Sequence, residues 1–168
     1  MPKPSLDDIL NIKDPMLNDN FDLLFDRIPG GGNNRQMLIQ CKTASKPGMS
    51  LQQAEMELFG HKVLHVGRKT FSHSMSISFH ESYDAFINRA LERWSEEGRK
   101  TKTQHGKFKR DYVATGTLTT YDQTGAVAQR WKVYNMWPTE VPEAQFDGSG
   151  GTAMTADATF AYDYYEPV

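Results

Sequence analysis

The chain has 168 residues, with 19 Lys and Arg against 21 Asp and Glu, so its formal net charge is only −2. A chain of this length fits one domain with a substantial core, since it buries roughly two thirds of the surface that it exposes when unfolded. Its apolar runs are far shorter than the roughly 18 residues of a membrane span, and its charged start lacks the apolar stretch of a signal peptide. The single cysteine, Cys41, excludes an internal disulfide and is expected to pack as a small apolar residue. Composition therefore indicates a protein that folds in a cytosol.

The first 19 residues are predicted to form an arm outside the folded domain. They are charged, prolines interrupt them, and their few apolar residues cannot build a core alone. Alternating apolar residues then predict a strand over 20–28, a hairpin turn at the glycine-rich segment 29–34, and a returning strand over 36–44. We therefore expect an N-terminal arm, residues 1–19, and one β domain, residues 20–168.

The middle of the chain is predicted to contain three further strands. Short strands at about 52–58 and 62–66 are joined by Phe59 and Gly60. From Phe71 to His80, apolar residues alternate with serines, a period of two that a helix cannot produce. One face of this strand should therefore meet the core, and the other should be polar.

A helix is predicted over about 82–97. Ser82 can cap its first turn, Asp84 suits the helix dipole there, and Gly98 ends it. Its apolar stripe repeats at helical spacing and comprises Tyr83, Phe86, Ile87, Ala90, Leu91 and Trp94. The charged residues lie off this stripe, so one face of the helix is expected to pack on the sheet.

The last third of the chain is predicted to add a hairpin and a closing strand. After a basic linker, two alternating segments, 111–121 and 126–137, flank a turn that contains a glycine, and a last strand covers about 152–165. The chain thus has seven or eight predicted strands and one predicted helix. We expect a mainly β fold of the α+β type, an antiparallel β-barrel or sandwich with one flanking α-helix.

Two aromatic-rich strand ends in this last third carry a family resemblance. The first reads NMWP at 135–138, and the second reads TFAYDYYE at 159–166. This pattern resembles the tail tube proteins of contractile-tailed bacteriophages, which are related to the tube subunits of type VI secretion. The resemblance is strongest from about Arg110 to Glu166, and the order of elements supports it from Asn20 onward.

The resemblance implies a structural subunit that is not an enzyme and carries no cofactor. Such subunits close into hexameric rings, and the rings stack into a hollow tube that conducts DNA during infection. The implied partners are further copies of the chain, the tail sheath, and the tape-measure, baseplate and terminator proteins, while DNA passes without specific binding and no membrane is involved. The protein would then be part of the virion tail and be assembled in the cytoplasm of the bacterial host.

Two sets of residues are candidates for assembly and channel surfaces under this resemblance. The arm and the loop formed by Lys46, Pro47, Gly48 and Met49 are polar or rich in Pro and Gly, so we expect contacts between subunits or rings to order them. Acidic side chains on an inner wall would repel phosphate and keep DNA from adhering. The candidate channel-facing residues are Asp157 and Asp163.

The charges are unevenly distributed along the chain. Residues 139–168 contain six acidic residues without a Lys or Arg, whereas residues 99–110 contain six basic residues without an acid. The surface should therefore have opposite poles, which in a self-assembling subunit can meet across an interface and fix its register. The alternative is that both segments are solvated and never meet.

Three alternative functions are weighed against the tube subunit. His61 and His65 lie four residues apart, but on a strand this spans roughly 13 Å, so one metal ion cannot reach both. The serines and histidines lack a nucleophile elbow that would mark a catalytic triad. The basic segment 99–110 could bind nucleic acid, yet it contains one aromatic residue, Phe108, and lacks a stacking platform. A monomeric ligand-binding β-barrel and the tube subunit of a related contractile injection system remain as alternatives.

Overall fold

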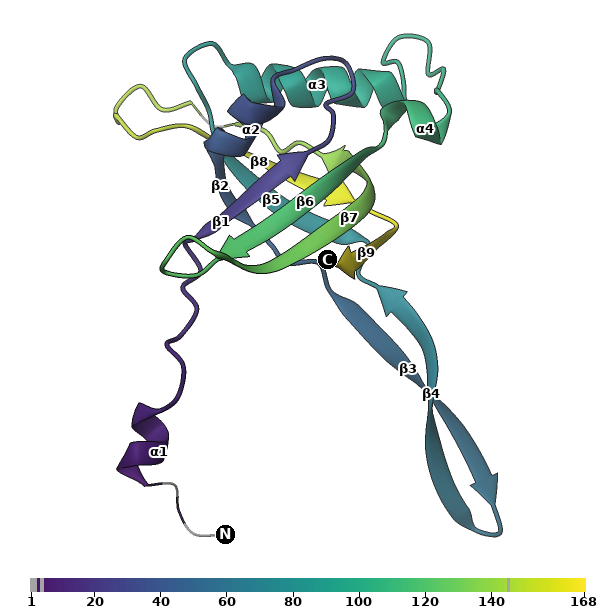
Figure 1. The fold of residues 1–168 in the computed structure, drawn as a ribbon. Helices are drawn as coiled ribbons and strands as arrows, with labels where there is room; N and C mark the ends of the chain where they lie inside the picture. Colours follow the sequence, from purple (N-terminus) through teal and green to yellow (C-terminus); the bar gives the residue numbers. More distant parts are fainter. Residues whose placement is uncertain (1–2, 4, 145) are drawn as a thin grey trace.

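The computed structural model describes residues 3, 5–144 and 146–168, and it consists of a β-rich body with two projections (Figure 1). The body is built on a seven-stranded antiparallel sheet of order β1-β6-β7-β8-β5-β2, with β9 paired to β7. Its strands are β1 (Phe21–Phe25), β2 (Cys41–Ala44), β5 (Ser74–His80), β6 (Ala114–Tyr121), β7 (Val127–Glu140), β8 (Thr155–Ala161) and β9 (Tyr164–Pro167). The predicted mainly antiparallel β fold is thus confirmed.

The long strand β7 divides the sheet into two layers. Its first part pairs with β6 and β9, and its last residues pair with β8. Asn135 lies at this change of partner with a φ of 57°, in the left-handed region that asparagine tolerates better than most residues. The core between the layers holds large buried side chains such as Phe25, Phe79 and Phe160.

The sheet is not a closed barrel, so the barrel is excluded from the two folds, barrel or sandwich, that the sequence left open. β1 and β2 stand at the two ends of the strand order, and within the described residues they do not pair with each other. β2 is only four residues long because a helix, α2 (Asn34–Gln40), occupies most of the segment predicted as a strand over 36–44. The edges of the sheet therefore stay open.

The helix α2 forms because of a local cap that hydrophobic alternation does not reveal. The side chain of Asn33 accepts hydrogen bonds from the backbone N–H groups of Arg35 (3.1 Å) and Gln36 (3.3 Å), as in a typical helix N-cap. Met37 is fully buried, whereas Ile39, which would share a face with Met37 in a strand, is exposed. The strand prediction for residues 36–40 is therefore wrong.

The helix α3 (Phe86–Gly98) confirms the predicted flanking helix and lies along one side of the body (Figure 1). Its buried face consists of Ile87, Ala90, Leu91 and Trp94. Its cap differs from the prediction, because Glu81 and not Ser82 accepts hydrogen bonds from the first turn, at 3.1 Å from the Ile87 N–H and 2.9 Å from the Asn88 N–H. Two short helices, α1 (Leu6–Leu10) in the arm and α4 (Lys109–Tyr112), were not predicted.

One of the two projections is the N-terminal arm. The other is a long β-hairpin, β3 (Met49–Leu58) and β4 (His61–Phe71), which forms a separate two-stranded sheet. Its turn lies at Phe59 and Gly60, as predicted, and both residues have positive φ, which matches the twist of a two-residue hairpin turn. Near the base, a Cβ on Gly67 would lie 2.9 Å from the carbonyl oxygen of Gln52, so glycine allows the close approach at a β-bulge. In Figure 1 the hairpin and the arm leave the body on the side opposite α3.

Candidate assembly surfaces

The outer part of the hairpin has two different faces. Cross-strand pairing places Ala54, Met56, Leu58 and Val63 on one face, which we call the apolar hairpin face, and His61 and His65 share it. The opposite face carries Glu55, Glu57 and Lys62 together with the exposed Leu64 and Val66, and a salt bridge of 2.7 Å joins Lys62 to Glu55. Phe59 at the tip is completely exposed.

A hairpin with this composition is not suited to remain solvated. An isolated two-stranded hairpin is marginally stable in water, and large exposed apolar patches on soluble proteins mark interaction sites. All ten residues of β3 are exposed, and several exposed residues on the two strands are large and apolar. The apolar hairpin face is therefore a candidate contact surface.

The base of the hairpin is firmly tied to the body. The carbonyl oxygen of Gly48 accepts hydrogen bonds from the Ser72 N–H (3.1 Å) and the Tyr162 hydroxyl (3.2 Å), and the hydroxyls of Ser72 and Tyr162 lie 2.7 Å apart. Phe71 packs edge-to-face on Tyr165, with ring centroids 5.5 Å apart. The hairpin thus leaves the body from a fixed root.

This root includes the loop that the sequence suggested as a contact between rings. The ammonium group of Lys46 lies 5.2 Å from the centre of the Trp131 ring, and Pro47 is buried, so both residues pack on their own subunit. Met49 is half exposed and begins β3. The loop therefore forms the root of the projection, and its role in contacts between subunits or rings stays a prediction.

A second surface is a row of small polar side chains across β5 and β8, which we call the hydroxyl face. The register pairs Ser76 with Thr159 and Ser78 with Asp157. The Ser78 hydroxyl donates a hydrogen bond to the carboxylate of Asp157, which is exposed. The structure therefore places Asp157 among serines and threonines on a polar surface.

Asp163 does not join this row. It lies in the turn between β8 and β9, where the Lys109 ammonium donates to its two carboxylate oxygens (2.7 and 2.5 Å) and the Asn135 amide donates to one of them (2.7 Å). Partial burial opposes ionisation, but these hydrogen bonds and the charge of Lys109 outweigh it and lower the pKa of the Asp163 carboxyl. Asp163 is thus held as an ion pair within the subunit.

We expect the Asp163→Asn variant to lose a small, pH-dependent part of its stability. A carboxyl whose pKa is lowered by folding adds stability above its unfolded pKa, near 3.8, and loses it as the pH falls through the folded value. The group is well exposed, so the loss at pH 7 should be below about 1 kcal/mol. Denaturant unfolding of both proteins between pH 7 and pH 2 measures it, and a difference that persists unchanged at pH 2 would contradict this assignment.

The described residues offer little for other classes of site. Among them, no group of three or more His, Cys, Asp or Glu residues could hold a metal ion, and each helix is too short or too polar to cross a membrane. Burial raises the pKa of the Cys41 thiol to about 12, so the thiol stays protonated where it packs against the core. The open strand edges and the exposed hairpin are suited to contact with other chains.

Comparison with known proteins gives one family and several structures. The family model described as phage tail tube protein matches residues 15–167. A chain in the cryo-EM structure of the anti-feeding prophage tube-terminating cap is similar at a TM-score of 0.68 and 14% identity, covering 94% of this chain and 93% of that one. A chain of the extended sheath–tube complex of the extracellular contractile injection system PVC is similar at a TM-score of 0.65 and 13% identity, covering 99% of this chain and 99% of that one. A chain of the SPP1 tail tube is similar at a TM-score of 0.51 and 11% identity, covering 91% of this chain and 78% of that one. No curated protein sequence matches the chain.

Proposed function

Because the chain belongs to the phage tail tube protein family, we propose that its copies close into hexameric rings and that these rings stack into a hollow tube. The family match over almost the whole chain carries this proposal. The open edges at β1 and β2 support it, because exposed strand edges otherwise promote aggregation and a closed ring of subunits uses them. No catalytic role is proposed.

The hydroxyl face is our candidate for the channel wall. It exposes serine and threonine hydroxyls together with the carboxylate of Asp157, and such a wall repels phosphate or leaves it unbound. Asp163 contributes less to this proposal, since Lys109 balances its charge. In a phage tail, DNA would pass along this wall without specific binding.

The hairpin and the arm are our candidates for contacts between rings. Both project from the same side of the body, and both expose apolar residues that find no cover on their own subunit (Figure 1). In the arm these are Leu6, Ile9, Leu10 and Ile12. A neighbouring ring that covers these side chains would gain roughly 25 cal/mol for each Å² of apolar surface removed from water.

The proposed partners follow from the family. They are the sheath around the tube, a tape-measure protein inside the growing tube, and baseplate and terminator proteins at the ends. The tube of a contractile injection system is the second candidate, favoured by the high coverage and TM-score of the extended sheath–tube complex. In the phage case the subunit is part of the virion tail and is assembled in the host cytoplasm.

Sizing of the purified chain over a range of concentrations, together with negative-stain microscopy, tests the proposal. Rings of six subunits and stacked tubes are the expected result. A monomer at every concentration would contradict the proposal and favour the monomeric ligand-binding alternative.

Deleting residues 1–19 should leave a folded subunit that assembles poorly. The main sheet begins at Phe21, and the arm's exposed apolar side chains add little to the body's core. Circular dichroism and thermal unfolding should match those of the full chain, while microscopy should show fewer and shorter tubes. Tubes of normal length and stability from the shortened chain would refute a role for the arm.

A further inference from the structure

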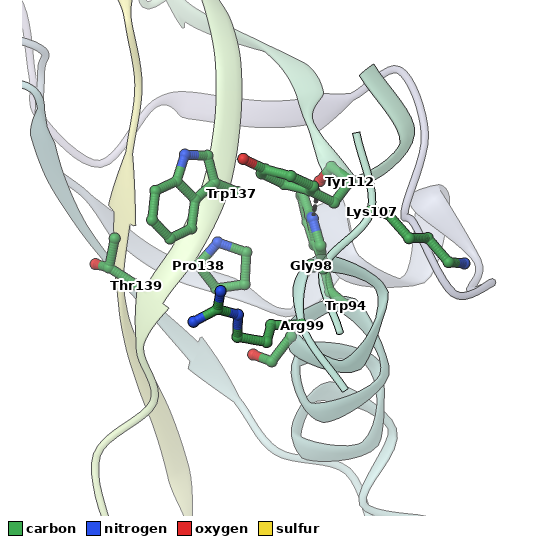
Figure 2. A pocket seen from close by; sticks show the side chains of 10 residues that line it. Trp94, Gly98, Arg99, Lys107, Tyr112, Trp137, Pro138 and Thr139 are labelled. Atoms are coloured by element: carbon green, nitrogen blue, oxygen red, sulfur yellow. Dashed lines mark hydrogen bonds between the residues drawn. The ribbon is translucent and has the colours of Figure 1, made fainter. Parts of the chain in front are cut away.

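A pocket of about 450 Å³ lies between the C-terminal end of α3 and the second half of β7 (Figure 2). Aromatic rings and a proline form much of its lining, and the rings of Tyr112 and Trp137 meet edge-to-face with centroids 6.0 Å apart. Trp94 lies deepest and donates its indole N–H to the Tyr112 carbonyl at 2.6 Å. Figure 2 shows Arg99 beside Pro138 on the rim. The pocket thus offers an aromatic interior and a cationic edge.

The segment that forms this edge, residues 99–110, contains six basic residues and no acidic residue. Arg99, Lys100 and Lys102 are exposed, and among the described residues no carboxylate lies within ion-pair distance of them. Lys107, which also lines the pocket, pairs with Glu97 of its own subunit. The unpaired cations make this end of α3 attractive to an acidic partner.

The opposite end of α3 carries the complementary charge. Residues 141–144 and 146–154 connect β7 to β8, and the Glu81 N–H donates to the Met154 carbonyl (3.0 Å), which fixes this connection beside the start of α3. Figure 1 shows the connection and the basic segment at opposite ends of the helix. The 13 residues of α3 separate the two ends by roughly 20 Å.

The acidic end also exposes an aromatic side chain. Phe146 is 85% exposed, and Glu143 and Asp147 flank it in the sequence. Covering a large apolar ring in this position with another protein surface is favourable, because it removes apolar area from water. Its combination with two carboxylates matches the aromatic interior and cationic rim of the pocket.

We propose that the pocket receives Phe146 of a second copy of the chain, while Glu143 and Asp147 of that copy pair with the cations around the rim. Two different surfaces of one chain then meet head to tail, which is the kind of contact that closes a ring. The charges fix the register, and the buried aromatic contributes most of the affinity. This inference rests on the proposed ring and names the residues that join its neighbours.

Charge reversal at each end gives a direct test. The acid-reversed variant carries Glu143→Lys and Asp147→Lys, and the base-reversed variant carries Arg99→Glu and Lys100→Glu. Neither should form rings alone, because like charges then meet at every contact. An equimolar mixture should restore rings of six, because alternating the two variants puts opposite charges at every contact. All four positions are exposed, so both variants should fold, which circular dichroism checks.

A matched control separates this register from simple attraction between oppositely charged proteins. A variant with Arg68→Glu and Lys69→Glu has the same net charge as the base-reversed variant, but its changes lie on the hairpin. This control should form rings by itself, because both of its proposed contact ends are native, and the acid-reversed variant should stay outside those rings when the two are mixed. Entry of the acid-reversed variant into the rings of this control, or normal rings from either reversed variant alone, would overturn the inference while leaving the tube proposal intact.

Phe146→Ala tests the aromatic half of the contact. Loss of a buried interface anchor should raise the dissociation constant of the ring about tenfold or more. The control Phe59→Ala removes an equally exposed ring from the hairpin tip and should leave single rings unchanged. An unchanged dissociation constant for Phe146→Ala would overturn the insertion. If the parent chain forms no ring, the proposed function fails together with this inference.

Discussion

Removal of the outer hairpin should abolish tubes while the body folds normally. The change replaces residues 52–68 by an Asn-Gly turn, which keeps the cross-strand pair of Leu51 and Lys69 and suits a two-residue hairpin. The outer hairpin packs on itself and not on the main sheet, so the free energy of unfolding should stay within about 1 kcal/mol of the parent. Denaturant unfolding measures the stability of the body, and electron microscopy shows whether tubes form.

Point substitutions on the two hairpin faces provide the control. Met56→Ser and Val63→Ser remove apolar surface from the apolar hairpin face, so tubes should become shorter and dissociate at lower denaturant concentration. Glu55→Gln on the opposite face removes the ion pair with Lys62 and should have a much smaller effect, because exposed ion pairs contribute little. Tubes of normal length from the shortened hairpin would show that the rings stack through another surface.

The Trp94→Ala variant should lose about 3 to 5 kcal/mol of its free energy of unfolding. The Trp94 ring meets the rings of Phe25 and Phe160 edge-to-face, both with centroids 5.5 Å away, so its removal leaves a cavity between α3 and both layers of the sheet. The substitution also removes the donor to the Tyr112 carbonyl. Denaturant unfolding at neutral pH is the appropriate measurement.

Two further variants separate the loss of the buried ring from the loss of an exposed aromatic residue and from the loss of the indole hydrogen bond. Tyr83→Ala removes an aromatic side chain that is fully exposed just before α3, and it should leave stability nearly unchanged. Trp94→Phe keeps a ring in the core but removes the indole donor, so its loss should be intermediate. An unfolding free energy of Trp94→Ala equal to the parent's would show that the aromatic cluster does not stabilise the body.

The sequence correctly predicted the elements in which apolar residues repeat because they pack in the core of the same chain. Ile87, Ala90, Leu91 and Trp94 repeat at helical spacing because one helix face packs on the sheet, and this face is buried as expected. The strand prediction failed over residues 36–40 because alternation over a few residues also fits a short helix, and the Asn33 cap favours the helix. Closure into a barrel could not be read from the sequence, since it depends on which edge strands pair.

The candidate surfaces were harder to predict for a different physical reason. Short strands at about 52–58 and 62–66 were predicted, but a strand pattern does not tell whether a face meets its own core or another chain. Asp157 and Asp163 looked equivalent in the sequence, whereas the structure gives one a row of hydroxyls and the other a lysine partner. Such partners come from residues distant along the chain, which spacing alone cannot reveal.

The strand pairing also sets an order of events during synthesis. The hairpin β3–β4 pairs residues that are close in sequence, so it can form as soon as Phe71 leaves the ribosome. β1 instead waits for β6, since Phe21 pairs with Thr120, and long-range pairing of this kind forms slowly. Each nascent chain therefore carries an exposed apolar hairpin before its body exists. Neighbouring ribosomes on one message would bring such hairpins together, so slow translation between residues 71 and 120 should increase aggregation.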